Sequence, residues 1–181
     1  LYHVTLNDLD FFSLISNCRD FPRKGIIFRD INSLLGTDHA LHYISNELYH
    51  RFNKLTFESI AGIESRGFVI ATALALKFGK GLIMIRKAGK LPGHTLKESY
   101  DIEYGSAVME IQKDAKKPGQ NILIADDLIA TGGSAVAAAR LVEKLGGNVT
   151  GFAFVIELDN LDGANKLRTL GYNVQSLVVY K

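Results

Sequence analysis

A glycine-rich turn in the second half of the chain carries residue types that suit an anion. Residues 122–134 read Ile-Leu-Ile-Ala-Asp-Asp-Leu-Ile-Ala-Thr-Gly-Gly-Ser. Gly132 and Gly133 have no side chain to keep a ligand from the backbone, and the hydroxyls of Thr131 and Ser134 flank them. The free N–H groups and the dipole of a helix that begins here would favour an anion. The turn therefore predicts a site for a phosphate monoester.

Two acids, Asp126 and Asp127, precede this turn and need a reason to lie beside a phosphate, because like charges repel. Neighbouring ribose hydroxyls supply one, since carboxylates accept charge-assisted hydrogen bonds from a diol. The two halves together fit a sugar 5-phosphate. The pattern is neither a nucleotide P-loop nor a dinucleotide fingerprint, because the chain has no Gly-Lys-Ser/Thr after the glycines and no Gly-x-Gly-x-x-Gly opening a helix.

A second turn of this kind, Glu64-Ser65-Arg66-Gly67, lies between an apolar run and an expected helix. Its arginine indicates a second anion site. Later, Arg86, Lys87 and Lys90 open a basic stretch punctuated by glycine and proline. Such a stretch is typical of a mobile lid that closes over a polyanion, and a solvated surface loop is the alternative.

The elements that must position these residues alternate between strands and helices. Apolar runs and turn residues predict strands at residues 59–63, 82–85, 122–125, 148–157 and 174–180. Helical periodicity predicts helices at residues 5–17, 37–55, 68–77 and 134–145, with a short one around 161–170. We therefore expect an α/β fold with a central, mostly parallel sheet flanked by helices, which binds ligands at the carboxyl ends of its strands.

Composition limits the class of protein. The 181 residues are the size of one domain, and the net charge of +2 argues against a dedicated nucleic-acid surface. No apolar run approaches the roughly 18 residues that span a bilayer, and no signal peptide opens the chain. Cys18 is the only cysteine, which excludes an internal disulfide and suits a reducing compartment. We expect a cytoplasmic protein with no membrane partner.

Residues 20–31 read Asp-Phe-Pro-Arg-Lys-Gly-Ile-Ile-Phe-Arg-Asp-Ile. Pro22 and Gly25 break the preceding helix, and the pattern alone indicates a loop that caps the core. His39 and His42 stand one helical turn apart, which could serve a metal, but no third ligand is evident at a matching spacing. We assign no metal-binding residue.

Four of these segments resemble one family. Residues 122–134 resemble the phosphoribosyl diphosphate (PRPP) motif of the type I phosphoribosyltransferases. Residues 20–31 resemble the purine-binding segment of the adenine phosphoribosyltransferases, and residues 64–67 their pyrophosphate loop. Their flexible lid is matched by Arg-Lys-x-Gly-Lys-Leu-Pro-Gly from Arg86 and by Glu-Tyr-Gly from Glu103. The resemblance runs from about residue 20 to residue 157.

The resemblance implies a purine salvage enzyme that transfers the phosphoribosyl group of PRPP to N9 of adenine, with diphosphate as leaving group. It implies catalytic roles for Glu103, Arg66, Lys87 and Tyr104. It implies PRPP binding by Asp126, Asp127, Ala130, Thr131, Gly132, Gly133, Ser134, Ser65, Arg66, Lys87 and Lys90. It implies adenine binding by Ile27, Phe28, Arg29 and Leu128. Magnesium would be held mainly by substrate oxygens and water.

The resemblance also implies one phosphoribosyltransferase domain over residues 1–181, with a purine-binding hood at about 1–35, a flexible lid at about 86–106, and a homodimer. Two alternatives remain open from the residues alone. One is a regulator that senses PRPP, although such a protein usually needs a DNA-binding segment or a basic face, and neither is visible. The other is an enzyme for a different base, because periodicity and composition do not name the base.

Overall fold

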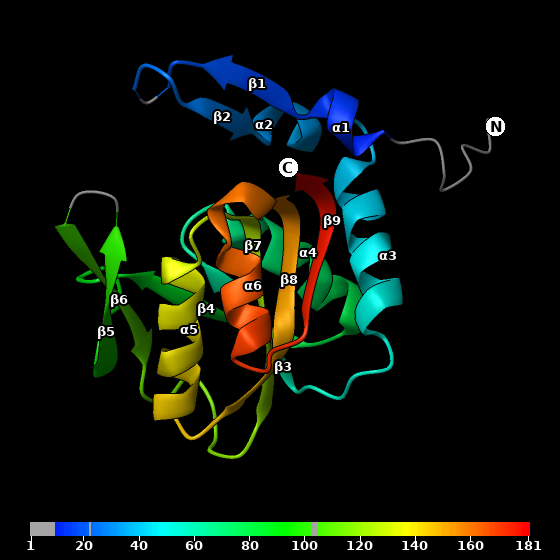
Figure 1. The fold of residues 1–181 in the computed structure, drawn as a ribbon. Helices are drawn as coiled ribbons and strands as arrows, with labels where there is room; N and C mark the ends of the chain where they lie inside the picture. The colour runs from blue at the N-terminus through cyan, green and yellow to red at the C-terminus, as the bar shows by residue number, and fades with distance from the viewer. Residues whose placement is uncertain (1–9, 22, 103–104) are drawn as a thin grey trace.

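A computed structural model shows one large sheet and one small one (Figure 1). The structure describes residues 10–21, 23–102 and 105–181. The large sheet has seven strands in the order β5-β6-β4-β3-β7-β8-β9. In chain order they are β3 (Ser59–Ile63), β4 (Gly81–Lys87), β5 (Thr95–Ile102), β6 (Gly105–Gln112), β7 (Asn121–Ile129), β8 (Asn148–Leu158) and β9 (Val174–Tyr180). The small sheet pairs β1 (Ser16–Arg19) antiparallel with β2 (Ile27–Asp30).

Strands β4, β3, β7, β8 and β9 run parallel, and only the β5–β6 hairpin at one edge runs antiparallel to its neighbours. The predicted mostly parallel α/β sheet is confirmed. The helices are α1 (Phe11–Leu14), α2 (Asn32–Leu35), α3 (Ala40–Phe52), α4 (Gly67–Phe78), α5 (Gly133–Lys144) and α6 (Gly163–Thr169), with a 3-10 turn η1 (Asp159–Leu161). None of the helices in the described part of the chain has the length and apolar character needed to span a bilayer.

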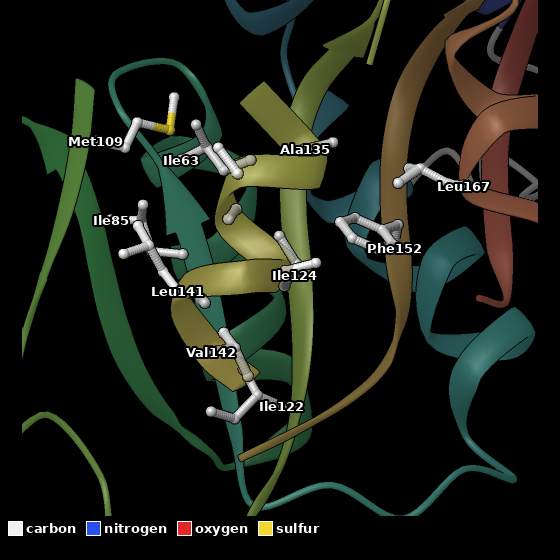
Figure 2. Close-up of a cluster of buried hydrophobic side chains, with 14 of the residues drawn as sticks. Ile63, Ile85, Met109, Ile122, Ile124, Ala135, Leu141, Val142, Phe152 and Leu167 are labelled. Carbon is white, nitrogen blue, oxygen red and sulfur yellow. The ribbon is translucent and has the colours of Figure 1, made fainter. Parts of the chain in front are cut away.

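Two apolar cores lie on opposite faces of the large sheet. Figure 2 shows the first core, where α5 and α6 cover one face. Its labelled side chains are Ile63, Ile85, Met109, Ile122, Ile124, Ala135, Leu141, Val142, Phe152 and Leu167. The second core lies under α3 and α4 and includes Ile44, Leu48 and Phe52 of α3. The central strands are apolar on both faces because helices cover both faces.

The helices that follow β3 and β7 leave the sheet on opposite faces (Figure 1). Strands β3 and β7 are neighbours in the sheet, with Gly62 aligned to Ala125. From β3 the chain proceeds through α4 to β4 on one side, and from β7 through α5 to β8 on the other. Open α/β sheets bind ligands where the strand order reverses in this way, at the carboxyl ends of the strands. The fold therefore places both predicted anion turns at the binding edge.

Two sequence predictions need correction. The helix expected over residues 5–17 is, within the described residues, only the four-residue α1, because Ser16 to Arg19 pair with β2 instead. Phe12 of α1 has 53% of its surface exposed, so this short helix does not bury the side chain in the core. Strand β7 continues to Ile129, so Asp126 and Asp127 lie within the strand and not at the start of a loop. Pairing of Asp126 with Phe154 of β8 holds this polar part of the chain extended.

Candidate active site

The turn between β7 and α5 is built from backbone. Gly132 lies just before α5 with φ of +82°, a left-handed conformation that favours glycine. In the described part of the chain no side chain caps this helix start. The first N–H groups of a helix have no partner within the helix, so those of Gly133 and Ser134 remain able to bind an anion. The turn is a cradle whose shape depends on glycine.

The acid pair lies directly before this cradle and is buried. Asp126 is 9% exposed and Asp127 is 5% exposed. The N–H of Asp127 donates to Oδ1 of Asp126 over 2.8 Å. Burial raises the pKa of Asp126 well above its usual value, and the negative charge of Asp127 adds to the rise. The pair therefore favours a partner that donates hydrogen bonds or carries positive charge.

Arg66 supplies such a partner from the neighbouring turn. Its Nε donates to Oδ2 of Asp127, and its guanidinium carbon lies 5.6 Å from the centre of the Phe28 ring. Burial disfavours the charged guanidinium, but the bond to Asp127 and the negative charges of Asp127, Asp126 and Asp30 together outweigh it and raise the pKa of Arg66. Arg66 thus links the acid pair to the small sheet, which carries the predicted purine-binding segment.

The turn between β3 and α4 is built from charged side chains. Glu64 accepts hydrogen bonds from Nε of Arg86 at 3.1 Å and from the N–H of Lys87 at 3.0 Å. Burial alone would raise the pKa of Glu64, but the bonds from Arg86 and Lys87 outweigh it and lower the pKa. Glu64 therefore fixes the end of β4, which carries Lys87, beside the Ser65–Arg66 turn.

A buried carboxylate organises the loop between β4 and β5. Glu110, 2% exposed, accepts the N–H groups of Lys90 and Leu91, each at 2.9 Å, and the hydroxyl of Thr95 at 3.2 Å. Burial would raise the pKa of Glu110, but the N–H groups of Leu91 and Lys90 outweigh it and lower the pKa. The backbone of Lys90 is held here, and Lys90 is not among the residues that line the central cavity.

A cavity of about 470 Å³ joins the two turns and the hairpin. The predicted residues that line it are Ser65, Arg66, Lys87, Asp126, Asp127, Leu128, Ala130, Thr131, Gly132, Gly133 and Ser134. A larger hollow, about 720 Å³, lies between α3 and α4 and is lined mainly by apolar side chains. We place the candidate site in the smaller cavity, because the acids, hydroxyls and cations converge there.

Of the four predicted adenine-binding residues, Leu128 lines this cavity, whereas Ile27, Phe28 and Arg29 do not. Ile27, Phe28 and Arg29 form β2, where Phe28 packs edge-on against Phe21 at 5.2 Å. Arg29 lies over the ring of Tyr180 at 4.1 Å and donates to Asn17. Phe28 reaches the cavity only through Arg66 in the contacts described. The predicted residues Glu103 and Tyr104 lie outside the described residues.

The β5–β6 hairpin adds cavity residues that the sequence analysis did not name individually, although residues 100–102 lie within the predicted lid. Tyr100, Asp101 and Ile102 of β5 line the cavity, and so do Met109 of β6 and Leu161 of η1. Glu98 ties β5 to α5 through Arg140, at 3.2 Å, and Lys144. Burial raises the pKa of Tyr100, and the charge of Asp126 adds to the rise. No local pattern marks these residues, because packing between distant segments brings them together.

The fold and the cavity together define a phosphoribosyltransferase. The sequence profile described as the phosphoribosyl transferase domain matches residues 37–180. This range includes both anion turns and the acid pair.

The relatives narrow the family. A curated adenine phosphoribosyltransferase of Cenarchaeum symbiosum is 49% identical over 95% of this chain and 100% of its own length. The crystal structure of adenine phosphoribosyltransferase from Thermoanaerobacter pseudethanolicus has a TM-score of 0.91 and 43% identity, over 97% of this chain and 100% of that one. The Saccharomyces cerevisiae enzyme, complexed with an imino-altritol bisphosphate and adenine, has a TM-score of 0.85 and 40% identity, over 92% and 96%. The chain belongs to the adenine phosphoribosyltransferase family.

Proposed function

We propose that this chain transfers the 5-phosphoribosyl group of PRPP to N9 of adenine, releasing AMP and diphosphate, as a step of purine salvage. The observation that carries the proposal is one cavity, in a chain of this family, that joins a glycine cradle, a buried acid pair and an arginine turn. These three features match the phosphate, the ribose diol and the diphosphate of PRPP in order.

In this proposal PRPP lies along the carboxyl ends of β3 and β7. The 5-phosphate binds the turn from Ala130 to Ser134, and the ribose hydroxyls bind Asp126 and Asp127. The diphosphate lies between Ser65, Arg66 and the lysines of the basic loop, Lys87 and Lys90. Adenine stacks on Phe28, with the backbone of Ile27 and Arg29 at its edge and Leu128 on its other face. Arg66 then exchanges Asp127 for diphosphate, because the diol takes its place at the acid pair.

Departure of diphosphate from C1 leaves oxocarbenium character on the ribose, as in glycoside cleavage. The chain accelerates this step by stabilising charge on the leaving group with Arg66 and Lys87 while adenine is held in line with C1. Glu103 handles the purine proton or orients the base, and Tyr104 meets the diphosphate. The hairpin that carries both residues excludes water, which otherwise competes for C1.

Magnesium belongs to the proposal as a partner of PRPP. The described residues contain no group of three or more His, Cys, Asp or Glu that could hold a metal ion. The acid pair offers carboxylate oxygens, which suit this ion, but Asp127 is engaged by Arg66. Substrate oxygens and water would therefore supply most of its ligands. When bound, the ion neutralises charge on the diphosphate.

We also propose the domain organisation, oligomeric state, location and partners of the protein. The chain forms a single phosphoribosyltransferase domain, with residues up to about 35 as purine hood and residues 86–106 as lid. It acts as a homodimer. It works in the cytoplasm. Its partners are adenine, PRPP and their products.

Diphosphate release from PRPP and magnesium tests the function, with adenine, guanine, hypoxanthine, xanthine, uracil and orotate supplied separately. Release with adenine alone, with AMP as product, is the expected result. Release with another base would keep the PRPP site and overturn the assignment of the base. Measurable PRPP binding without release for any base would favour a regulator that senses PRPP.

A further inference from the structure

The turn between β7 and α5, residues 130–134, is called the phosphate turn. It packs directly against Gly163, the first residue of α6. The N–H of Gly163 donates to the carbonyl oxygen of Ala130 over 3.0 Å. A methyl group at Gly163 would lie 2.2 Å from that oxygen, 2.6 Å from the nitrogen of Gly132 and 2.7 Å from the carbonyl carbon of Thr131. Favourable contact between non-bonded heavy atoms begins near 3.5 Å. All three neighbours are backbone atoms, so no side chain can rotate away to make room.

The contact is reciprocal. A methyl group at Gly132 would lie 3.1 Å from both Cα and the carbonyl oxygen of Gly163. The two backbones therefore approach each other as closely as only a pair of glycines allows. Gly163 does not have the left-handed φ that explains Gly132, so close approach is the reason for glycine at this position.

A second residue of α6 holds the next carbonyl of the turn. Nζ of Lys166 donates to the carbonyl oxygen of Thr131 over 3.3 Å. Helix α6 thus binds two consecutive carbonyl groups, those of Ala130 and Thr131. In a trans peptide the C=O and the following N–H point in opposite directions. The N–H groups of Thr131 and Gly132 therefore point away from the α6 groups that bind these two carbonyl oxygens.

We propose that Gly163 and Lys166 are positioning residues for the phosphate turn. By binding the carbonyl groups of Ala130 and Thr131, they orient two N–H groups toward the 5-phosphate before the substrate arrives. The inference rests on the proposed function and deepens it, because it assigns the shape of the phosphate site to two residues of α6. A cradle preoriented in this way needs no rearrangement when the anion binds.

The test compares Gly163→Ala with Gly81→Ala, using ribose 5-phosphate as the probe in calorimetry. The added methyl group at Gly81 lies 3.7 Å from the nearest atom, Oγ of Ser59, at the opposite end of the sheet. Gly163→Ala should weaken the binding of ribose 5-phosphate at least about tenfold, since a displacement of site groups by about 1 Å can cause a much larger loss of function. In steady state its KM for PRPP should rise while its KM for adenine stays within about twofold. Gly81→Ala should match the wild type in each measurement.

Lys166→Met provides a second variant in case Gly163→Ala does not fold. It removes one donor at an exposed position, so ribose 5-phosphate should bind about threefold more weakly with an unchanged Tm. Unchanged ribose 5-phosphate affinity in the folded variants would overturn the positioning role and leave the proposed function intact. A parallel rise of both KM values with a large fall in Tm would also overturn it, since it shows general damage. Failure of the wild type to bind ribose 5-phosphate would overturn the proposed function and this inference together.

Discussion

The two anion turns follow neighbouring strands of one sheet, yet they are built from different groups. The β7–α5 turn presents backbone N–H groups, shaped by Gly132 and supported by Gly163 of α6. The β3–α4 turn presents Arg66, whose guanidinium is bonded to Asp127. Its other charged member, Glu64, is bonded to Arg86.

Because one turn uses backbone groups and the other a charged side chain, the two sites would respond differently to a ligand. Backbone N–H groups keep the orientation that the fold gives them, and no opposite charge must leave them before an anion binds. The cation of the β3–α4 turn is compensated inside the protein and must change partner to reach a diphosphate. We infer that the phosphate turn is preorganised and that the arginine turn is switchable.

Gly132→Ala should have the largest effect. A side chain at φ of +82° costs about 1–2 kcal/mol, and its methyl group would also press on Gly163 at 3.1 Å. We expect kcat/KM for PRPP to fall about 100-fold, measured as diphosphate release. Gly146→Ala is the matched control, because Gly146 has φ of +75° and its added methyl would meet Pro118 at 3.3 Å, away from the cavity. Equal losses in both variants would show that backbone strain alone is responsible.

Arg66→Gln should separate the two turns. Removing the guanidinium deprives the diphosphate of a charged donor, so kcat/KM for PRPP should fall roughly tenfold to thirtyfold. Ribose 5-phosphate should bind as well as before or better, because Asp127 is released for the diol. Arg51→Gln, which removes an arginine bonded to the carbonyl of Ser176, controls for the lost charge. Weaker ribose 5-phosphate binding in Arg66→Gln would contradict the division of labour between the turns.

Asp126→Asn should stabilise the fold while impairing activity. Because the pKa of Asp126 is raised above 3.8, the folded state binds more protons than the unfolded state as pH rises above about 4, and stability falls across that range. Asparagine removes the buried charge and keeps the oxygen that accepts from Asp127. A gain of about 1 kcal/mol corresponds to a Tm increase of about 2–4 °C at pH 7, measured by calorimetry. Asp114→Asn, at an exposed surface turn, is the control and should leave Tm unchanged. A lower Tm in Asp126→Asn would contradict the predicted stabilisation.

Glu64→Gln should have the smallest effect. The pKa of Glu64 is lowered, so its contribution to stability is present above its usual value of 4.5 and is lost as pH falls through the lowered pKa. The amide loosens Arg86 and the end of β4, and we expect KM for PRPP to rise about threefold. Glu58→Gln is the control. Glu58 directly precedes β3, at the end of the strand away from the site, and its carboxylate accepts from the N–H of Asn121; this KM should stay unchanged. An equal rise of KM for PRPP in both variants would show that Glu64 has no specific role in the β3–α4 turn.

The sequence predicted most of the large sheet because continuous apolar runs mark strands that are buried on both faces. The bounds of β3 and β9 agree with the prediction, and β4, β7 and β8 are longer than predicted. The error in β7 has a physical cause. Asp126 and Asp127 end the apolar pattern, whereas pairing with β8 continues the strand through them. Polarity in a sequence reports solvent preference and not backbone pairing.

The parts of the site that escaped prediction depend on contacts between distant segments. Gly163 is one glycine among 17 in the sequence, and only its approach to residues 130–132 distinguishes it. Tyr100 and Asp101 reach the cavity because the hairpin packs beside Gly133, where an added methyl would lie 2.9 Å from the carbonyl oxygen of Asp101. Spacing along the chain carries no information about such approaches.

The small sheet has a consequence for how this family can diversify. Within the described residues, β1 and β2 pair only with each other, and the segment is anchored in the second core by Ile15, Ile31 and Leu34. The stretch between these anchors is contiguous in the chain and shares no backbone ladder with the large sheet. Natural selection, or a grafting experiment, could rewrite residues 16–30 as a cassette while the catalytic scaffold stays in register. Under the proposed function, the contacts of Ile27, Phe28 and Arg29 to the base could then change without altering the two PRPP turns.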